Sequence, residues 1–505
     1  MNERKIKKML NGKRTVAVPC GQFGDSGKGK VVDLLGDWAD ITARGAGGDN
    51  AGHTMVAKGL KIISHLVPCG ILRDAEGKVN VIGSGVVFNP RVALEELNLL
   101  TAAGITHNNL KISLFAKLTL PQHILLDRVK ESDAGKGKIG TTGRGIGPVY
   151  TDHYARVGLI VNDLLNRDIF VEKLRRNLKE KIKLLRLYDP KLVMQVMQHP
   201  HLENGIFYHP EHIIDVDAVV ERYCQYGVML KEMVCDADEY MRQNVGIKNI
   251  LLEGSQGLML SVDKGNYPNV TSSDSSPQGL VRGVGLEDSD LDLTLTVLKA
   301  FYMTRVGNGP LPTEFGGNDS AEWCGTYTEK LGINREKEKQ LVPEASVNDP
   351  DPFRQGIAIR QEGDEYGATT GRPRRPGWFD LPMTRYAKKH CGPNVVLTKL
   401  DVLSSCETIK ICVEYIFDGP DYHYGDTTIK RGDRLEVAIP YNDVLKHCKP
   451  VYKEFPGWMC DIRGARTLKE LPAKLLNIFD YVKDATHIEP QILSVSPDRE
   501  KTIIL

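Results

Sequence analysis

The sequence predicts an α/β fold in which a large, mostly parallel central sheet is flanked by helices. Short apolar runs such as Val81–Phe88, Ile250–Gly254 and Val395–Asp401 alternate with helical patterns along the chain. These runs end in polar residues, and nearly continuous apolar strands are typical of parallel sheets that are buried on both faces. Because ligands bind beyond the carboxyl ends of such strands, we expect the polar residues there to form the functional site.

Length and composition set the bounds of this interpretation. With 505 residues, 41% of them hydrophobic, the chain can bury a large core, and its length alone allows two to four domains. The 66 basic and 65 acidic residues leave a net charge of +1. This balance favours small charged ligands in local pockets and argues against nucleic-acid or membrane partners. No apolar run approaches the ~20 residues that a membrane helix needs.

The N-terminus and the cysteines indicate a cytoplasmic protein. Met1–Lys8 is basic but is not followed by an apolar segment, so we interpret it as a frayed tail, with a transit peptide as the alternative. The ten cysteines are scattered and include no C-x-x-C pair. We expect them to be reduced thiols, and they give little support to a zinc site.

We expect residues 1–505 to form a single catalytic domain, because the sequence contains no internal repeat and no clear linker. Within it, residues 161–248 predict a helical extension, in which Leu174–Ile182 has the spacing of an amphipathic face. Residues 316–362 are rich in Gly, Asn, Asp, Glu, Lys and Pro and lack sustained periodicity. They predict a charged loop excursion over the surface, partly mobile.

The segment Gly21–Lys30 carries the strongest functional signal. It lies between a short apolar run, Val16–Cys20, and a helix start at Val31–Leu35, so it reads as the loop of a strand–loop–helix unit. Its four glycines let the backbone approach an anion, and N–H groups at a helix N-terminus favour phosphate. It departs from the Walker A pattern, because its first glycine lies one residue too early and a glycine replaces the hydroxyl residue. Asp25 places a carboxylate among the expected phosphates, where it needs a metal ion to bind or a proton to abstract. The loop therefore predicts catalysis rather than nucleotide binding alone.

Two more glycine-rich loops carry polar side chains. In Gly47–Thr54, Asn50 and His53 are free to face a ligand, and His53 can donate to a developing negative charge or act as an acid. A hydrogen-bonded loop histidine is the alternative. Gly140–Pro148, followed by Arg156, offers hydroxyls, backbone amides and a guanidinium that suit a phosphomonoester. A surface turn is the alternative there.

Further polar segments lie in the C-terminal half. In Glu253–Gly257, the side-chain amide of Gln256 can recognise the edge of a base by hydrogen bonds. For this segment and for Tyr267–Ser273, the alternative is a helix cap or a turn. Gly367–Arg375 places three arginines around a Gly/Thr loop, which can clamp a carboxylate and a phosphate; the alternative is a solvated basic turn. Pro373 restricts the residue before it to an extended conformation.

The segment Thr398–Asp401 follows an apolar run and suits a guanine base. The carboxylate of Asp401 can accept two hydrogen bonds from guanine donors that adenine lacks, which discriminates by roughly 10⁴-fold. Four residues are a weak pattern, because strands often end in Lys or Asp. Ser494–Arg499 either completes such a base pocket or forms a turn.

Taken in this order, these segments resemble those of the adenylosuccinate synthetase family, and the resemblance runs from about Val16 to Leu505. The family joins IMP and L-aspartate at the expense of GTP, and gives adenylosuccinate, GDP and phosphate through a 6-phosphoryl-IMP intermediate. The resemblance implies a P-loop-NTPase-like fold with helical and loop extensions. It also implies Mg²⁺ as cofactor and a homodimer in which Arg156 reaches across the interface.

The resemblance assigns roles to individual residues. The catalytic residues are Asp25 (the base at N1 of IMP), His53, Lys28 and Gln256, and Mg²⁺ is held by Asp25 and the carbonyl of Gly52. The GTP-binding residues are Gly24, Asp25, Ser26, Gly27, Lys28, Gly29, Lys30, Gly52, His53, Thr54, Arg374, Lys399, Leu400, Asp401, Ser494, Val495 and Ser496. The IMP-binding residues are Asp25, Lys28, Asn50, Ala51, Gly52, His53, Thr142, Arg156, Gln256, Thr271 and Arg372. The aspartate-binding residues are Ala368, Thr369, Thr370, Gly371, Arg372 and Arg374.

The sequence departs from the usual family pattern at four positions. Phe23 stands where Trp is usual, and Ser26 stands where Glu is usual, which removes a negative charge beside the phosphates. Ser496 replaces a usual glycine, and Pro373 replaces an arginine found in some members. Two alternatives to IMP ligation follow: a related synthetase that acts on another purine monophosphate such as dGMP, and a non-catalytic guanine-nucleotide-binding paralogue. Asp25 argues against the first, and Ser26 and Ser496 are the features that favour the second.

Overall fold

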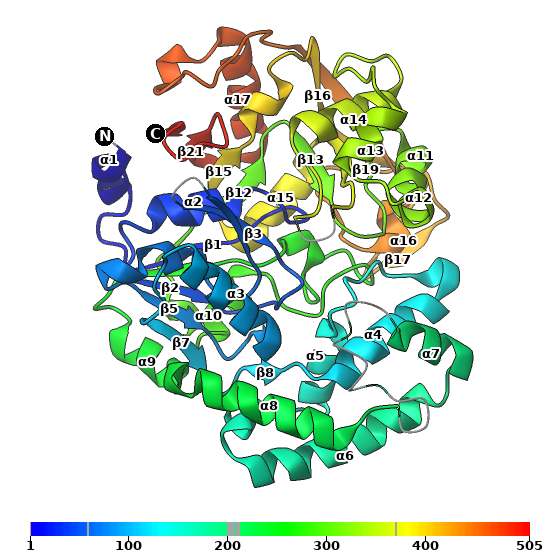
Figure 1. The fold of residues 1–505 in the computed structure, drawn as a ribbon. Helices are drawn as coiled ribbons and strands as arrows, with labels where there is room; N and C mark the ends of the chain where they lie inside the picture. Colours follow the sequence, from blue (N-terminus) through cyan, green and yellow to red (C-terminus); the bar gives the residue numbers. More distant parts are fainter. Residues whose placement is uncertain (1, 58–59, 199–201, 203–207, 209–212, 369–370) are drawn as a thin grey trace.

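The main sheet has seven strands, and each neighbouring pair in it is parallel. The computed structural model describes residues 2–57, 60–198, 202, 208, 213–368 and 371–505. The strand order is β11-β1-β10-β2-β5-β7-β9 (Figure 1). The strands are β1 (Thr15–Val18), β2 (Ile41–Arg44), β5 (Val79–Ile82), β7 (Leu110–Ser113), β9 (Val234–Cys235), β10 (Ile250–Glu253) and β11 (Leu293–Thr294). The predicted α/β class with a mostly parallel central sheet is therefore confirmed.

Helices cover both faces of this sheet because its strands are apolar on both faces. Val16 and Val18 of β1 belong to one buried cluster, together with α2 (Lys28–Leu35) and α3 (Pro90–Ala102). Ala17, between them, belongs to a second cluster with α9 (Ala237–Asn244) and α10 (Pro277–Arg282). Successive side chains of a strand point to opposite faces, so these short strands read as continuous apolar runs.

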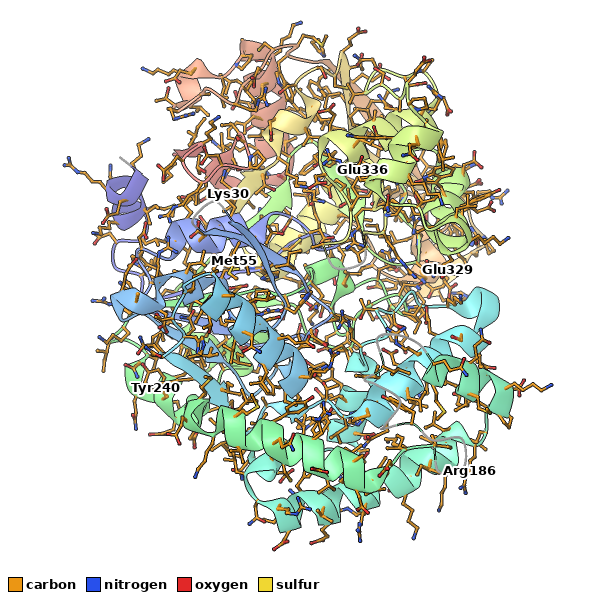
Figure 2. The ribbon with its side chains drawn as sticks, in the orientation of Figure 1. Lys30, Met55, Arg186, Tyr240, Glu329 and Glu336 are labelled. Atoms are coloured by element: carbon orange, nitrogen blue, oxygen red, sulfur yellow. The ribbon has the colours of Figure 1, made fainter. Side chains whose placement is uncertain are left out.

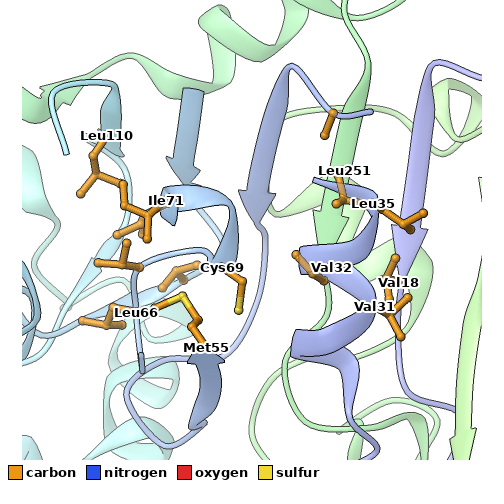
Figure 3. Close-up of a cluster of buried hydrophobic side chains, with 14 of the residues drawn as sticks. Val18, Val31, Val32, Leu35, Met55, Leu66, Cys69, Ile71, Leu110 and Leu251 are labelled. Carbon is orange, nitrogen blue, oxygen red and sulfur yellow. The ribbon is translucent and has the colours of Figure 1, made fainter. Parts of the chain in front are cut away.

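Helix α2 is fixed on the sheet directly after the glycine-rich loop. Its residues Val31, Val32 and Leu35 are buried with Val18 of β1 and Leu251 of β10 (Figure 3). The helix begins after Gly27, whose φ of 77° is left-handed and suits glycine. The loop therefore spans the short path from the carboxyl end of β1 to the N-terminus of α2, as predicted.

A second group of strands continues beside β1. A parallel bridge joins Cys20 to Val297 of β12 (Thr296–Lys299), which pairs in parallel with β15 (Asn394–Thr398). β15 pairs with β21 (Glu489–Ser494), and β22 (Thr502–Ile504) closes this sheet in the antiparallel direction. The carboxyl ends of β1, β2, β10, β15 and β21 each lead into a segment that the sequence singled out.

The remaining elements surround these sheets. The strands are β3 (His53–Ala57), β4 (Leu60–Ser64), β6 (Val87–Phe88), β8 (Lys117–Leu118), β13 (Tyr302–Arg305), β14 (Arg375–Asp380), β16 (Thr408–Phe417), β17 (Tyr422–Tyr424), β18 (Thr427–Ile429), β19 (Arg434–Leu435) and β20 (Cys448–Pro456). The helices are α1 (Asn2–Met9), α4 (Pro121–Asp133), α5 (Ile146–Tyr154), α6 (Arg167–Leu185), α7 (Pro190–Met197), α8 (Val216–Leu230), α11 (Gly317–Glu322), α12 (Thr328–Leu331), α13 (Arg335–Leu341), α14 (Pro352–Glu362), α15 (Leu381–Cys391), α16 (Asn442–Leu445) and α17 (Ala473–Thr486). Helix α1 lies against β22, so the two termini are close together (Figure 1). Within the described ranges, no helix has the length and apolar character that crossing a membrane requires.

The described residues between 161 and 248 include helices α6, α7, α8 and α9. Helices α6 and α8 share a buried cluster with α4, and Phe170 stacks on Tyr223 with ring centroids 6.1 Å apart. Figure 1 shows these helices along the lower edge of the molecule. The segment also contains β9, which extends the main sheet by pairing with β7 and which the helical prediction did not include.

The expectation of a loop over residues 316–362 is wrong in its secondary structure. The segment forms α11, a π-helical turn (Trp323–Tyr327), α12, α13 and α14. Side chains of Asn334 and Asp351 cap the N-termini of α13 and α14. The buried pair Arg360 Nε and Glu338 Oε2, 3.0 Å apart, then joins these two helices. Because such short helices are held by caps and a buried ion pair rather than by a long apolar face, their sequence shows little periodicity.

The apolar run Val81–Phe88 is also two strands rather than one. β5 ends at Ile82 and β6 begins at Val87, with a close backbone contact between them: a Cβ on Gly85 would lie 2.0 Å from the carbonyl oxygen of Gly45. The two glycines at positions 83 and 85 permit this approach, so the chain turns where the sequence suggested a continuous strand.

Candidate active site

A cavity of about 1800 Å³ opens where the carboxyl ends of the strands meet. Pockets for one small ligand usually measure roughly 300–1,000 Å³, so this cavity has room for several small molecules. Its lining comes from both halves of the chain: Lys30 and Met55 lie among the N-terminal elements and Glu329 among the yellow-green helices (Figure 2). Distant segments of the sequence therefore share one binding space.

The cavity gathers most of the predicted site residues. Those that line it are Gly24, Asp25, Ser26, Gly27, Lys28, Gly29, Lys30, Asn50, Ala51, Gly52, His53, Thr54, Thr142, Gln256, Ala368, Arg372, Arg374, Lys399, Asp401, Ser494 and Ser496. Leu400 and Val495 belong instead to a buried apolar cluster. Thr271, Gly371 and Arg156 are not among the lining residues, and Thr369 and Thr370 lie outside the described residues.

The glycine-rich loop is fixed by hydrogen bonds to residues that follow β10 and end β12. The side-chain amide of Gln22 bonds the backbone of Lys299 twice: Nε2 donates to the carbonyl at 3.4 Å, and Oε1 accepts from the amide at 3.0 Å. Lys28 donates to the carbonyl of Gln256 at 2.7 Å. Among the residues that the structure describes, no side chain caps the N-terminus of α2. Its positive end therefore faces the cavity, where a phosphate can bind.

Asp25 sits in this loop and is paired with a distant arginine. Its backbone is left-handed, with φ of 47°, and its Oδ2 accepts from Arg374 Nε at 2.6 Å. Burial raises the pKa of Asp25, but Arg374, Lys299 and Lys28 outweigh this effect and hold the pKa at about 2. The carboxylate is therefore ionised at neutral pH and stabilised by a counter-ion from the Gly367–Arg375 loop.

His53 is fixed by a buried carboxylate. Its Nδ1 forms a short contact with Oε1 of Glu253, which ends β10, and Glu253 also accepts from the amide of Cys69 at 2.7 Å. Burial raises the pKa of Glu253 and lowers that of His53, while their contact opposes both shifts. Together with Arg44 and the Cys69 amide, it holds the pKa of Glu253 at about 2. The imidazole thus carries its proton on Nδ1, which leaves Nε2 for a ligand in the cavity.

Gln256 and Asn50 join two of the predicted loops. Gln256 Nε2 donates to Asn50 Oδ1 at 2.9 Å, and Asn50 Nδ2 donates to Thr271 Oγ1 at 3.4 Å. Thr271 therefore supports the site from behind the cavity wall. Gln256 itself lines the cavity.

The loop Gly140–Pro148 is shaped by two carboxylates one turn apart on α4. Glu131 accepts from the amides of Gly140 and Thr141 at 2.7 and 3.2 Å, and Asp127 accepts from the amide of Gly145 at 2.9 Å. These bonds turn the loop so that Thr142 and Arg144 line the cavity. Arg156 follows α5, is exposed and has φ of 63°.

Lys399, Asp401 and the turn after β21 line the end of the cavity where the resemblance places the guanine base, here called the base end. Lys399 is left-handed, with φ of 57°, which turns the chain sharply at the end of β15. Burial raises the pKa of Asp401. Lys30, which we expected to contact GTP, donates to Ser494 Oγ at 2.7 Å and to the carbonyl of Ser496 at 2.8 Å. It therefore ties α2 to the C-terminal turn.

Two backbone hydrogen bonds join Gly367, at the start of the arginine-rich loop, to residues later in the loop. The amide of Gly367 donates to the carbonyl of Arg372 at 2.8 Å, and the amide of Gly371 donates to the carbonyl of Gly367 at 2.7 Å. Gly371 has φ of 63°, which favours glycine. The loop presents Ala368, Arg372 and Arg374 to the cavity.

Of the departures from the family pattern, Ser26 has the clearest environment. Its carbonyl accepts from Thr398 Oγ1 at 2.7 Å, which joins the phosphate loop to β15. Its buried hydroxyl has no hydrogen-bond partner within the described part of the chain. A ligand phosphate is a suitable acceptor for this hydroxyl.

The roles of Glu253, Lys299 and Glu365 were not predicted. The sequence could have indicated a role for Glu253, because it is the polar residue at the end of the apolar strand β10. Glu365 forms a buried ion pair with Lys299, 2.5 Å apart, across 66 positions of sequence, and no local pattern announces it.

Two sets of residues can be tested for metal binding. Donor atoms of His53, Cys69 and Glu253 lie within 4.8 Å of one another and are buried, but the direct contact between His53 and Glu253 makes them a hydrogen-bonded pair rather than a metal cage. Asp25 and Gly52 both line the cavity beside the phosphate loop. A carboxylate with a backbone carbonyl is an oxygen donor set that suits Mg²⁺.

Comparisons with known proteins agree with this geometry. A family model described as adenylosuccinate synthetase matches residues 17–503. Adenylosuccinate synthetases of Streptococcus gordonii and Streptococcus sanguinis are each 40% identical over 494 residues, which cover 97% of this chain and 98% of theirs. The fully ligated adenylosuccinate synthetase of Plasmodium falciparum superposes with a TM-score of 0.77 at 29% identity, over 97% of this chain and 99% of that one.

A more distant structure shares the fold. The succinoaminodeoxyadenylate synthetase of cyanophage S-2L, bound to dGMP and dATP, matches with a TM-score of 0.51 at 17% identity. The match covers 97% of this chain and 95% of that one.

Proposed function

Because the chain belongs to the adenylosuccinate synthetase family, and is an enzyme of this type that ligates IMP and aspartate, we propose that its cavity couples this ligation to GTP hydrolysis. The observation that carries the proposal is the meeting of Asp25, His53 and the glycine-rich loop in one cavity. An ionised carboxylate beside phosphate-binding amides is placed to take a proton from a purine ring.

We propose that Asp25 is the general base. Removing the N1 proton of IMP makes O6 nucleophilic, and O6 then attacks the γ-phosphorus of GTP, so that the O6–P bond forms as the bond to GDP breaks. A carboxylate with a low pKa is always available but is a weak base, so Arg374 must leave Asp25 before the proton moves. The amino group of aspartate then attacks C6 and phosphate departs.

His53 and Lys28 act on the phosphoryl group in this scheme. In its protonated form, which the contact with Glu253 favours, His53 donates from Nε2 to an oxygen of the transferring group and assists its departure as phosphate, while Glu253 holds the ring at Nδ1. Lys28, which donates to the carbonyl of Gln256, stabilises the negative charge of the phosphoryl group. The side chain of Gln256 holds the edge of the hypoxanthine base. Asp25 and the carbonyl of Gly52 would hold Mg²⁺, which supplies charge neutralisation to the phosphates.

We propose that the active form is a homodimer. Arg156 is exposed and outside the cavity lining, so its IMP-phosphate role requires a second copy of the chain. Mixing the inactive Asp25→Asn and Arg156→Ala proteins should restore up to about a quarter of the activity, because half the subunits of each mixed dimer then have a complete site. Absence of any recovery would contradict this arrangement.

Release of phosphate from GTP tests the proposed reaction. Phosphate should appear with IMP and L-aspartate together and should fall sharply when either is omitted or when ATP replaces GTP. Higher activity with dGMP in place of IMP would favour the related synthetase. GTP binding with no aspartate-dependent phosphate release would favour the non-catalytic paralogue.

A further inference from the structure

Glu365 lies at the centre of a buried polar network in the cavity wall. Its side chain is 1% exposed. One carboxylate oxygen accepts from Lys299 Nζ at 2.5 Å and from Thr304 Oγ1 at 3.3 Å, and the other accepts from Lys399 Nζ at 2.6 Å and from Tyr302 OH at 2.7 Å. Two ammonium groups, one from the last residue of β12 and one from the residue after β15, thus share one carboxylate.

The charges make Glu365 indispensable to both lysines. Lys299 is fully buried and Lys399 is three-quarters buried, and a buried ammonium group is costly unless it is paired. Without the carboxylate, two like charges would remain together in a region of low dielectric. The positions of both lysines therefore depend on Glu365.

Lys399 connects this network to the base end of the cavity. Its Nζ donates to Glu365 and also to the carbonyl of Gly363 at 2.7 Å. Two acceptors at the tip fix the four-carbon stem, which otherwise has many rotamers. The stem follows β15 two residues before Asp401, so a fixed stem offers a flat apolar surface beside the carboxylate that is proposed to read guanine.

The same network reaches the phosphate loop and the arginine-rich loop. The backbone of Lys299 holds Gln22, three residues before Asp25. The carbonyl of Glu365 accepts from the amide of Arg374 at 2.9 Å, and Arg374 pairs with Asp25. Glu365 therefore contacts the Thr398–Asp401 and Gly367–Arg375 segments directly, and it reaches the phosphate loop through Lys299.

We infer that Glu365 is a positioning residue for the guanine nucleotide: it fixes the stem of Lys399 against the base and joins the base end of the cavity to the phosphate loop. This inference rests on the proposed function, because it takes GTP as the phosphoryl donor. It adds a residue that does not touch the reacting atoms but determines nucleotide affinity.

Calorimetric titration with GDP tests the inference on the full chain. Glu365→Gln should weaken GDP binding about tenfold, because an amide offers one acceptor oxygen and turns its NH₂ toward an ammonium group. Glu365→Asp keeps the charge but is one methylene shorter and cannot span both lysines, so we expect a threefold to fivefold loss. The matched control is Asp349→Asn, at a carboxylate that is not among the cavity-lining residues and pairs with Arg354 at 2.8 Å, and it should bind GDP like the wild type.

Kinetics separate positioning from general damage to the fold. In Glu365→Gln and Glu365→Asp, the KM for GTP should rise while the KM for IMP stays within about twofold; a loosened fold would raise both. Melting curves identify any variant that fails to fold. If Glu365→Gln does not fold, the GDP affinity and the two KM values of Glu365→Asp test the inference. Equal GDP affinity in wild type and both folded variants would overturn the inference. Failure of the wild type to bind GDP would instead overturn the proposed function.

Discussion

Asp25 and His53 line the same cavity, yet they are held in opposite ways. His53 is buried and its partner Glu253 is also buried, at the end of a central strand. Asp25 lies in a loop with its side chain 36% exposed, and its partner Arg374 comes from a turn 349 residues away. One group is fixed by the core of the sheet and the other by a contact between two loops.

This difference indicates when each group becomes ready to react. The ring of His53 already has its orientation and tautomer, because Glu253 cannot move without disturbing β10. The negative charge of Asp25 is compensated by Arg374, which is itself expected to bind L-aspartate. In the proposed mechanism, a ligand that draws Arg374 away frees Asp25, and we expect proton removal to begin only after the cavity is filled. The following predictions test this contrast, from the largest effect to the smallest.

Asp25→Asn should reduce turnover more than a hundredfold and leave GDP affinity within a few-fold. The amide keeps the shape of the loop but cannot take a proton, and general-base catalysis contributes about 10²-fold or more. Phosphate release and GDP titration on the same preparation measure both quantities. Retention of more than roughly a tenth of the activity would remove Asp25 from the role of base.

Glu253→Gln should reduce turnover by about 10- to 100-fold, because the carboxamide holds the His53 ring less firmly and no longer favours its protonated form. Cys69→Ala is the control. It removes a thiol 3.4 Å from the same carboxylate and should stay within about threefold of the wild type. An equal loss in both variants would mean that the packing around Glu253 matters rather than its charge.

Arg374→Lys should raise the KM for L-aspartate about tenfold with a smaller change in kcat. Lysine keeps the positive charge near Asp25 but lacks the planar fork that binds a carboxylate at two points. Steady-state kinetics with L-aspartate varied at saturating IMP and GTP provide the measurement. A fall in kcat without a change in KM would show that Arg374 acts on the chemical step instead.

Acidification should destabilise the wild type more than Glu253→Gln. Folding lowers the pKa of Glu253 from its ordinary 4.5 to about 2. The ionised group therefore adds stability that is complete above pH 4.5 and is lost as the pH falls toward 2. Between pH 5.5 and 3.5, the melting temperature of the wild type should fall about 2 °C further than that of the variant. Parallel curves would contradict a depressed pKa at Glu253.

The sequence predicted the local features of the site and missed the long-range ones. The glycine-rich phosphate loop and the polar residues at the strand ends follow from short patterns, and the structure brings most of these segments into one cavity. The left-handed backbone of Lys399 was not predicted. The pairing of His53 with Glu253 spans 200 positions, and no periodicity encodes such a contact. Glu365 was missed for the same reason.

The fold shows the same division. β1, β10 and α2 were predictable, because burial on both faces leaves a continuous apolar run. The helices of residues 316–362 were not, since the buried pair of Arg360 and Glu338 stabilises them and their polar composition is that of a loop. Tertiary contacts decided the structure where the local pattern was weak.

The most direct test is a crystal structure of the protein with IMP and GDP. We expect the carboxylate of Asp25 within hydrogen-bond distance of N1 of the hypoxanthine ring, with Arg374 turned toward a ligand and the His53–Glu253 contact unchanged. A purine bound elsewhere, with Asp25 still paired to Arg374, would contradict the account.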